Sequence, residues 1–422
     1  MSDTPNSRRE FLSHSAKLAT AAGLASMAMA QTANAAPFDR GPKINVTAGP
    51  KPRKIGPNDT IGLGLIGMGG QGRYDLERLL KNNPNISVKA VADPDPNNAR
   101  LAAELVKSIT GETIDIYPDF DDYKNKLLAR TDIDAVLTAT PCYMHGPIHL
   151  ACFEAGKHFY GEKPLCTEAS EADALVEAQR KNPEVVGQIG FQRRGSRLYA
   201  EGIKRIRDGV IGDPMDGRGA WNNAWGPIGL PHEKAEKWPG RIWLARRKWS
   251  GDWMLEQACH TWDVFCWVTG EPPIAASGVG RQDVFADMDP DRDVTDFYFA
   301  HLEFPGKFFV DFEHSWICPK KDPNGRFSGV FERVAGKKGG ILLNEGIVLP
   351  RDDKGEIEKY APDEGDHYVL SLKAFINSIR TGAPVVCGVE SSRLSTYAGL
   401  LVREAVYRGR RVELKELGYK RM

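Results

Sequence analysis

Short apolar runs alternate with amphipathic stretches through the first half of the chain. Residues 61–66 hold two isoleucines and two leucines in six positions, a composition typical of a strand buried on both faces. Apolar side chains then recur at helical spacing over residues 74–80. Later runs predict strands at 86–92, 133–138, 157–160 and 185–191, and helices at 146–155 and 168–180. Strands that alternate with helices predict a parallel, doubly wound sheet with ligands at the carboxyl ends of its strands.

The pattern changes from about residue 215. Apolar and polar positions alternate over residues 275–281, 295–304, 307–314 and 330–343, which predicts a large, mostly antiparallel sheet with one packed face. Helical patterns lie at 253–268, 367–380 and 391–407. The expected fold class is therefore α/β: an N-terminal Rossmann doubly wound parallel sheet, then a C-terminal α+β domain with a large open, mostly antiparallel sheet.

The first 35 residues have the organisation of an export signal. Arg8 and Arg9 are adjacent, residues 18–30 are uncharged, and residues 33–35 form an Ala-Asn-Ala cleavage site. This order is typical of a twin-arginine signal, which exports folded proteins. At ~1.5 Å per residue the uncharged stretch is too short to cross a hydrocarbon core of ~30 Å. We therefore expect a periplasmic protein with no stable membrane span.

These patterns divide the chain into four parts. They are a signal peptide at 1–35, a linker or arm at 36–59, a nucleotide-binding Rossmann domain at 60–185, and a substrate-binding α/β domain with C-terminal helices at 186–422. Prolines and glycines that follow the cleavage site indicate the linker or arm.

Composition excludes several classes of function. Basic and acidic residues both number 56, so the net charge favours neither nucleic acid nor an anionic membrane as a partner. The seven cysteines form no C-x-x-C pair, which argues against a zinc site or a disulfide framework. We expect no metal.

A glycine-rich turn links the first predicted strand to the first predicted helix. Residues 67–72 read G-x-G-x-x-G, and strand, motif and helix stand in the order that dinucleotide binding requires. Gly67 permits the tight turn, while Gly69 and Gly70 leave room for a pyrophosphate at the helix N-terminus. Gly72 lets the helix pack closely on the strand.

A second group of polar residues follows the later strands. Asp93 ends the strand at 86–92, about twenty residues after the glycine motif, where a carboxylate accepts hydrogen bonds from the adenosine ribose. Such a carboxylate repels a 2′-phosphate, so we expect NAD, with NADP possible. Other candidate cofactor contacts just past strand ends are Thr140, Pro141, His145, Glu162 and Lys163.

Five motifs together resemble one known family. They are the glycine motif, Ala139-Thr140-Pro141 with His145, residues 155–158 leading to Glu162-Lys163-Pro164, residues 190–194 (Gly-Phe-Gln-Arg-Arg), and Glu256, His260 and Asp263. The resemblance is to the Gfo/Idh/MocA oxidoreductases, which include glucose–fructose oxidoreductase and inositol dehydrogenase. It implies NAD(P)-dependent oxidation of a CH–OH group of a sugar, sugar derivative or cyclitol. It also implies a homo-oligomer, dimer or tetramer, formed through the open sheet.

The same resemblance implies that Lys163 and His260 act at the reacting carbon of the substrate. Glu256 stands four residues before His260, where inositol-dehydrogenase-like members usually carry Asp. This spacing predicts that both lie on one face of a helix, so that the carboxylate can orient the imidazole. Lys163, partly desolvated beside a nucleotide, can have a lowered pKa and polarise or deprotonate the alcohol.

The substrate contacts are less closely defined by the sequence. Gln192 and Arg193 follow a predicted strand and are candidate hydroxyl contacts, with loop capping as the alternative. Asp263 either contacts the substrate or holds its helix. His145 is expected to shape the cofactor pocket. Tryptophans that can stack on a sugar, or equally fill a core, lie at 221, 225, 238, 243, 249 and 253.

Three functions remain open. The first is a dehydrogenase that releases reduced NAD. The second is a redox-neutral enzyme with a tightly bound nucleotide, which oxidises a sugar and then reduces a second substrate or completes a glycosidic cleavage. The third is a non-catalytic ligand-binding relative. Export favours the second because no free NAD pool is expected outside the cytoplasm, whereas Lys163 and His260 argue against the third.

Overall fold

The computed structural model describes residues 37–224, 226, 228, 239–360 and 365–421. Residues 40–422 form one compact unit of the chain, and this unit is described below. The expected signal peptide lies outside the described residues, as do Trp225 and Trp238. Within the described part of the chain, no helix combines the length and apolar character needed to cross a membrane.

The first sheet has six parallel strands in the order β3-β2-β1-β4-β5-β6, which confirms the predicted doubly wound sheet. Its strands are β1 (Ile61–Ile66), β2 (Ile86–Ala92), β3 (Asp115–Tyr117), β4 (Ala135–Thr138), β5 (His158–Gly161) and β6 (Gly187–Ile189). The strand order reverses between β1 and β4. In such sheets the crevice at this reversal, at the carboxyl ends of the strands, is where ligands bind.

Helices connect these strands. They are α2 (Gly70–Asn82), α3 (Pro96–Thr110), α4 (His145–Glu154), α5 (Ala169–Lys181) and α6 (Arg197–Arg207), with short turns η1 (Tyr123–Leu127), η2 (Cys142–Met144) and η3 (Gln192–Gly195). Helix α3 shows how sequence sets the ends. The Asp95 side chain accepts from the Asn97 N–H at its start, and Gly111 in a left-handed conformation (φ 79°) ends it.

The second sheet has nine strands in the order β14-β13-β12-β11-β7-β10-β9-β8-β15. They are β7 (Pro214–Asn222), β8 (Ala275–Arg281), β9 (Phe297–Phe304), β10 (Phe308–Ser315), β11 (Gly329–Gly336), β12 (Gly339–Leu342), β13 (Ile347–Pro350), β14 (Glu358–Lys359) and β15 (Val412–Glu413). All neighbours are antiparallel except β7 and β10. Alternate residues of β10 are buried, as predicted for a sheet with one packed face.

The remaining helical segments follow β7. They are η4 (Pro239–Ala245), α8 (Arg247–Ser250), α9 (Trp253–Glu256), α10 (Cys259–Thr269), η5 (Pro305–Lys307), α11 (His367–Thr381), α12 (Val389–Arg408) and η6 (Leu414–Leu417). The single helix predicted over 253–268 is wrong, because it is interrupted between α9 and α10. At the interruption the φ of Gln257 is −119°, far from the usual helical value near −63°.

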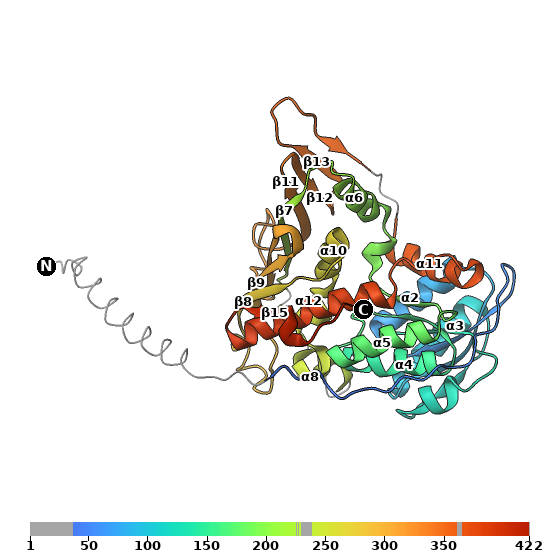
Figure 1. The fold of residues 1–422 in the computed structure, drawn as a ribbon. Coiled ribbons are helices and arrows are strands. Elements are labelled where there is room, and N and C mark those ends of the chain that lie inside the picture. The colour runs from blue at the N-terminus through green and yellow to red at the C-terminus, as the bar shows by residue number, and fades with distance from the viewer. Residues whose placement is uncertain (1–36, 225, 227, 229–238, 361–364, 422) are drawn as a thin grey trace. The chain divides into compact units, whose positions relative to one another are not determined.

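The boundary between the domains differs from the one predicted at 185/186. Strand β6 lies beyond it and pairs with β5 in the first sheet. Helix α11 returns to pack against α2 (Figure 1), and Leu372, Phe375, Ile376 and Ile379 enter the core of the first domain. Helix α12 packs against α5, α10 and β8 and so joins both domains.

The segment before β1 is an arm bound to the first domain. The Gly49 N–H donates to the Asn182 side chain over 2.7 Å, and Lys181 donates to the Val46 carbonyl over 2.8 Å. Arg53 pairs with both carboxylate oxygens of Asp134, each at 2.8 Å. Of the two predicted alternatives, linker or arm, residues 40–59 form the arm.

Candidate functional site

The glycine turn between β1 and α2 has the shape that a pyrophosphate needs. Gly67 adopts a positive φ of 73°, and a Cβ on Gly72 would lie 2.6 Å from the Gly67 carbonyl oxygen. A Cβ on Gly69 or Gly70 would meet nothing within 4 Å. Since no side chain caps α2 at Gly69, its first N–H groups are available to an anion. These residues fit NAD.

Asp93 braces this turn from the end of β2. Its carboxylate accepts from the Met68 N–H at 2.7 Å and from the Asp95 N–H at 2.9 Å. Burial raises the pKa of Asp93 above its usual value. Each oxygen keeps a second lone pair, so the ribose contact remains a prediction. The bracing contact, which sequence reasoning does not reveal, holds the turn in place without any ligand.

His145 connects the loops that follow β4 and β5. Its Nδ1 lies 2.6 Å from the Pro164 carbonyl and its Nε2 lies 2.9 Å from the Thr140 carbonyl. Burial lowers the pKa of His145, and a neutral ring donates to only one of these carbonyls at a time. The Thr140 hydroxyl is buried without a partner among the described residues. This geometry agrees with the predicted role of His145 in shaping the pocket.

Lys163 reaches from the first domain to the interruption between α9 and α10. Its Nζ donates to the Glu256 carbonyl at 2.7 Å and lies 3.1 Å from Glu256 Oε1. Burial alone would lower the pKa of Lys163, but the Glu256 carboxylate and other neighbouring groups outweigh burial and raise it. The lowered pKa predicted from the sequence is therefore wrong, and Lys163 is protonated. It can polarise an alcohol oxygen but cannot deprotonate it.

His260 is held by aromatic rings rather than by Glu256. Its ring stacks on Trp221, with centroids 5.6 Å apart and planes 17° apart, and meets the edge of Phe191 at 5.9 Å. The buried Nδ1 has no hydrogen-bond partner among the described residues. Burial, then the charges of Lys163 and Arg193, lower the pKa of His260 well below its usual value. His260 is therefore neutral, and the predicted Glu256–His260 pairing is corrected.

Arg193 is fixed by a buried glutamate that the sequence does not single out. Its guanidinium donates to Glu332 Oε1 at 2.6 Å, and the same carboxylate accepts from Thr261 at 2.8 Å and Tyr199 at 2.9 Å. Glu332 lies on β11 in an alternating strand, where the pattern alone does not reveal which charged residue faces inward. These contacts place Arg193 near His260, because Arg193 lies over the Trp221 ring at 5.5 Å.

Asp263 is fully engaged within the protein. Its two carboxylate oxygens accept from Arg194 at 2.7 and 2.8 Å, and one also accepts from Ser395 at 2.9 Å. The side chain is 1% exposed. Of the two predicted roles, this geometry corresponds to holding the helix rather than to contacting the substrate.

Gln192 and Arg193 face a pocket of about 390 Å³, a volume within the range of small-molecule sites. The Gln192 amide donates to the Tyr368 hydroxyl at 3.3 Å. Residues from both domains line the pocket: Tyr74, Gln192, Arg193, Leu198, Tyr199, Asn344, Asp366, His367 and Tyr368.

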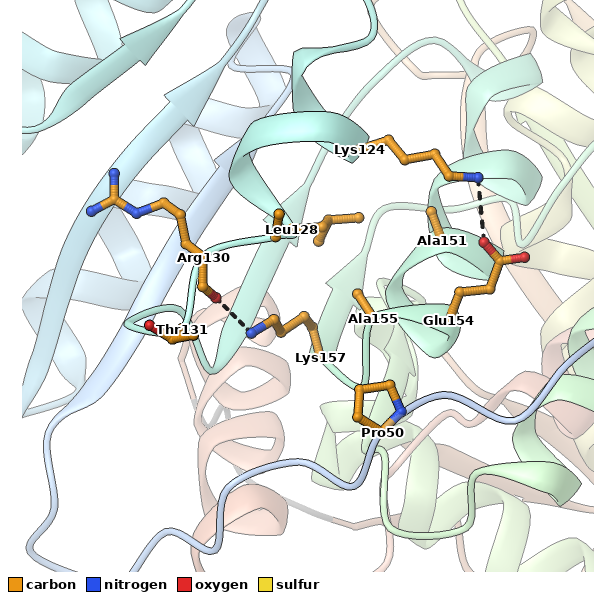
Figure 2. A pocket seen from close by; sticks show the side chains of 10 residues that line it. Pro50, Lys124, Leu128, Arg130, Thr131, Ala151, Glu154, Ala155 and Lys157 are labelled. Atoms are coloured by element: carbon orange, nitrogen blue, oxygen red, sulfur yellow. Dashed lines mark hydrogen bonds and ion pairs between the residues drawn. The ribbon is translucent and has the colours of Figure 1, made fainter.

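A second pocket, of about 420 Å³, lies at the amino ends of β4 and β5 (Figure 2). Its residues 129–131 precede β4, and Ala155 and Lys157 precede β5. The Lys157 ammonium group is already hydrogen-bonded within the protein there, since it donates to the Arg130 carbonyl at 2.8 Å. This pocket is therefore separate from the carboxyl ends of the strands, where the glycine turn and Lys163 lie. In the described ranges no cluster of three or more His, Cys, Asp or Glu suits a metal ion.

Two family models match the chain. Residues 61–189 match the Gfo/Idh/MocA model described as "Oxidoreductase family, NAD-binding Rossmann fold". Residues 199–342 match the model described as "GFO/IDH/MocA C-terminal domain". The first match contains the glycine turn and Lys163, and the second contains His260 and Glu332.

Similar proteins include enzymes of known activity. The chain is 27% identical over 361 residues to scyllo-inositol 2-dehydrogenase (NAD(+)) of Bacillus subtilis strain 168, covering 83% of this chain and 95% of that one. The structure of Lactobacillus casei scyllo-inositol dehydrogenase with NAD(H) and scyllo-inositol aligns with a TM-score of 0.64 and 21% identity, covering 84% and 99%. Levoglucosan dehydrogenase in complex with NADH and levoglucosan aligns with a TM-score of 0.68 and 20% identity, covering 84% and 99%. These two structures share the fold.

Proposed function

This chain belongs to the Gfo/Idh/MocA family of NAD-binding oxidoreductases, and from that premise we propose that it dehydrogenates a CH–OH group of a cyclitol or sugar. Bound NAD supplies the hydride acceptor. The observation that carries the proposal is a pair of groups held in complementary ways: Glu256 anchors the Lys163 ammonium at 2.7 and 3.1 Å, and the buried Nδ1 of His260 has no hydrogen-bond partner among the described residues. An alcohol oxidation needs one group to hold the oxygen and another to take its proton.

Each side chain has one task in this proposal. Lys163, anchored by Glu256, donates to the substrate oxygen and stabilises the negative charge that develops on it. Neutral His260 accepts the hydroxyl proton, and Trp221 keeps its ring oriented. Arg193 and Gln192 bind the remaining hydroxyl groups from the wall of the pocket.

The substrate class is proposed from the relatives. Curated relatives act on scyllo-inositol or other inositols, and a cyclitol is compact and rich in hydroxyl groups. Asp93 favours NAD over NADP, because a carboxylate at the end of β2 repels a 2′-phosphate.

The test is oxidation of a substrate panel by purified protein. With NAD⁺ and scyllo-inositol, myo-inositol, levoglucosan or glucose, we expect NADH to form with at least one substrate. Lys163→Met and His260→Ala should each lower turnover by ~10²-fold while NAD affinity in calorimetry stays near native. Lys81→Met, at an exposed lysine paired with Glu77, is the matched control and should keep full activity. Native turnover in either site variant would remove that residue from the mechanism.

We also propose export and a retained nucleotide. Residues 1–35 have the pattern of a twin-arginine signal, so the folded enzyme would reach the periplasm with its nucleotide already bound. Turnover there requires that the nucleotide be reoxidised in place, by a carbonyl substrate or by the second half of a redox-neutral reaction. Extensively gel-filtered protein should still contain nucleotide and turn over repeatedly with sugar and a carbonyl acceptor. Empty protein that needs added NAD would refute retention and leave an ordinary dehydrogenase.

The open sheet is the proposed surface for self-association. On strands β8, β9 and β10 the apolar side chains of Val279, Phe299 and Phe309 are 65%, 51% and 43% exposed. Large apolar side chains grouped on one face are typical of a surface that another molecule covers. Light scattering should show a dimer or tetramer, and Phe299→Glu should shift it toward monomer.

A further inference from the structure

Asp75 is a buried carboxyl group in the helix that carries the glycine turn. It lies on α2, is 0% exposed, and accepts from the Gln71 side chain at 3.0 Å through one oxygen. Its other oxygen, Oδ2, accepts no hydrogen bond from an N–H group or an alcohol O–H group of the described residues. A buried carboxyl oxygen without a donor is costly unless the group is neutral or shares a proton.

Glu162 is a second carboxyl group in the same condition. It follows β5, is 4% exposed, and accepts the Lys163 N–H through Oε2 at 3.2 Å. Its Oε1 is buried without another donor and lies where a side chain on Gly190 would stand, 2.5 Å from the position of a Cβ. Gly190 therefore leaves the space that Glu162 occupies.

The two carboxyl groups are in hydrogen-bonding contact with each other. A hydrogen bond between two carboxyl groups requires a proton on one of them. Burial, then the charge of Glu162, raises the pKa of Asp75 well above its usual value. Burial raises the pKa of Glu162 to about 7, although Lys163 opposes the shift. The proton belongs to Asp75, because Asp75 is the more deeply buried of the two and Glu162 has the Lys163 N–H and the Lys163 charge beside it.

We propose that Asp75 is a positioning residue for the reaction: as a neutral carboxylic acid it donates a hydrogen bond to the Glu162 carboxylate and fixes the Glu162–Lys163 turn against α2. The bond joins the helix that would hold the pyrophosphate to the turn that carries Lys163. Placement of Lys163 relative to the helix that would hold the pyrophosphate then depends on one contact. The kinetic part of this inference rests on the proposed dehydrogenase function, whereas the proton on Asp75 does not.

The charges around the pair come from three sides. Arg78 on α2 acts on Asp75, while Lys163 and Glu256 act on Glu162. Tyr160 on β5 and Tyr368 on α11 complete the enclosure, and burial followed by the charge of Glu162 raises the pKa of each.

The first experiment uses the protein without nucleotide. The folded protein holds a proton on Asp75 that the unfolded chain releases above pH ~4. Its stabilising effect is complete below that pH and is lost as pH rises towards the folded pKa. Asp75→Asn keeps an N–H donor and has no such loss. The thermal midpoint of the wild type should therefore fall relative to that of Asp75→Asn as pH rises from 4 to 8. A difference between the two midpoints that stays constant with pH would overturn the inference that Asp75 is protonated in the folded protein.

The second experiment measures the pH profile of turnover. Asp75→Asn should keep near-native turnover at neutral pH and lose the alkaline decline that follows ionisation of Asp75, while Asp75→Ala should lose ~10-fold or more. The KM for NAD should change less than turnover. Equal losses in Asp75→Asn and Asp75→Ala, or unchanged profiles in both, overturn the positioning role.

A matched control separates this role from general stability. Glu171 on α5 is a half-buried carboxyl with one buried oxygen, and burial raises its pKa to about 7. Glu171→Gln should alter the pH dependence of the thermal midpoint but leave the pH profile of turnover unchanged; a changed profile overturns the assignment to Asp75. If the wild type oxidises no member of the substrate panel, the proposed function fails, and the midpoint experiment alone still decides whether Asp75 is neutral.

Discussion

At the scale of single residues, the site separates two groups that are both buried. Burial alone would lower the pKa of both Lys163 and His260, but Lys163 meets the Glu256 carboxylate whereas His260 meets the cations Lys163 and Arg193. One is therefore held protonated and the other neutral. These opposite environments make Lys163 the hydrogen-bond donor to the substrate oxygen and His260 the proton acceptor.

Removing the charge of Glu256 should lower the pKa of Lys163. Glu256→Gln keeps the backbone carbonyl contact but removes the carboxylate that raises the pKa of Lys163, so burial then lowers it. The charged lysine, present below its pKa, is lost as pH rises, and turnover of the variant should decline at a lower pH than that of the wild type. Parallel pH–rate profiles of the two proteins would contradict this, and Glu77→Gln, at an exposed carboxylate, is the control.

The sequence predicted which residues carry the chemistry better than how they pair. Lys163 and His260 stand in motifs that place them near the nucleotide. The partner predicted for Glu256 was wrong. A four-residue spacing suggests a partner on the same helix, His260, whereas the observed partner, Lys163, lies 93 positions away in the sequence. A signal for Asp75 does exist: Gly72, Leu76 and Leu79 are buried on α2, and helical spacing places residue 75 on the same face.

At the scale of elements, the glycine turn was predictable because its geometry is local. Strand β1, the turn and α2 follow one another within 22 residues. Strand β7 could not be placed in the same way, since its neighbours β10 and β11 lie about a hundred residues further along the chain. Its parallel pairing with β10, and the interruption between α9 and α10, depend on contacts that no local pattern encodes.

Two glycines of this turn should respond differently to the same substitution. A side chain at Gly69 enters open space, whereas one at Gly72 meets the Gly67 carbonyl oxygen at 2.6 Å. Gly69→Val should keep the thermal midpoint and abolish NAD binding in calorimetry, because its side chain occupies the path of the pyrophosphate. Gly72→Val should lower the midpoint by several degrees or prevent folding. NAD binding by Gly69→Val at native affinity would contradict the phosphate assignment.

At the scale of the whole molecule, the first domain is not built from one continuous stretch of the sequence. Helix α11 comes after the second sheet yet supplies Leu372, Phe375 and Ile376 to the core around β1. The first domain is therefore completed only when the last part of the chain has folded. The predicted division at residue 185 missed this, because a helical pattern at 367–380 does not indicate which core it joins.

Phe375 gives a direct measure of this dependence. Its side chain is fully buried and meets Tyr160 edge to face at 5.8 Å. Phe375→Ala should lower the free energy of unfolding by ~3–5 kcal/mol in urea denaturation. Lys373→Ala, on the exposed face of the same helix, should change it by less than about 0.5 kcal/mol. A loss below about 1 kcal/mol at Phe375 would mean that α11 is not part of this core.

Helix α12 sets a limit on how the enzyme can exchange its ligands. Its 20 residues extend about 30 Å at ~1.5 Å per residue, and they pack against α5 on one domain and α10 and β8 on the other. A continuous helix acts as a strut, so the domains cannot rotate apart as two rigid halves while both sets of contacts persist. Ligand traffic then passes through rearranging loops, and the dissociation rate of a bound nucleotide becomes a property of those loops rather than of a hinge.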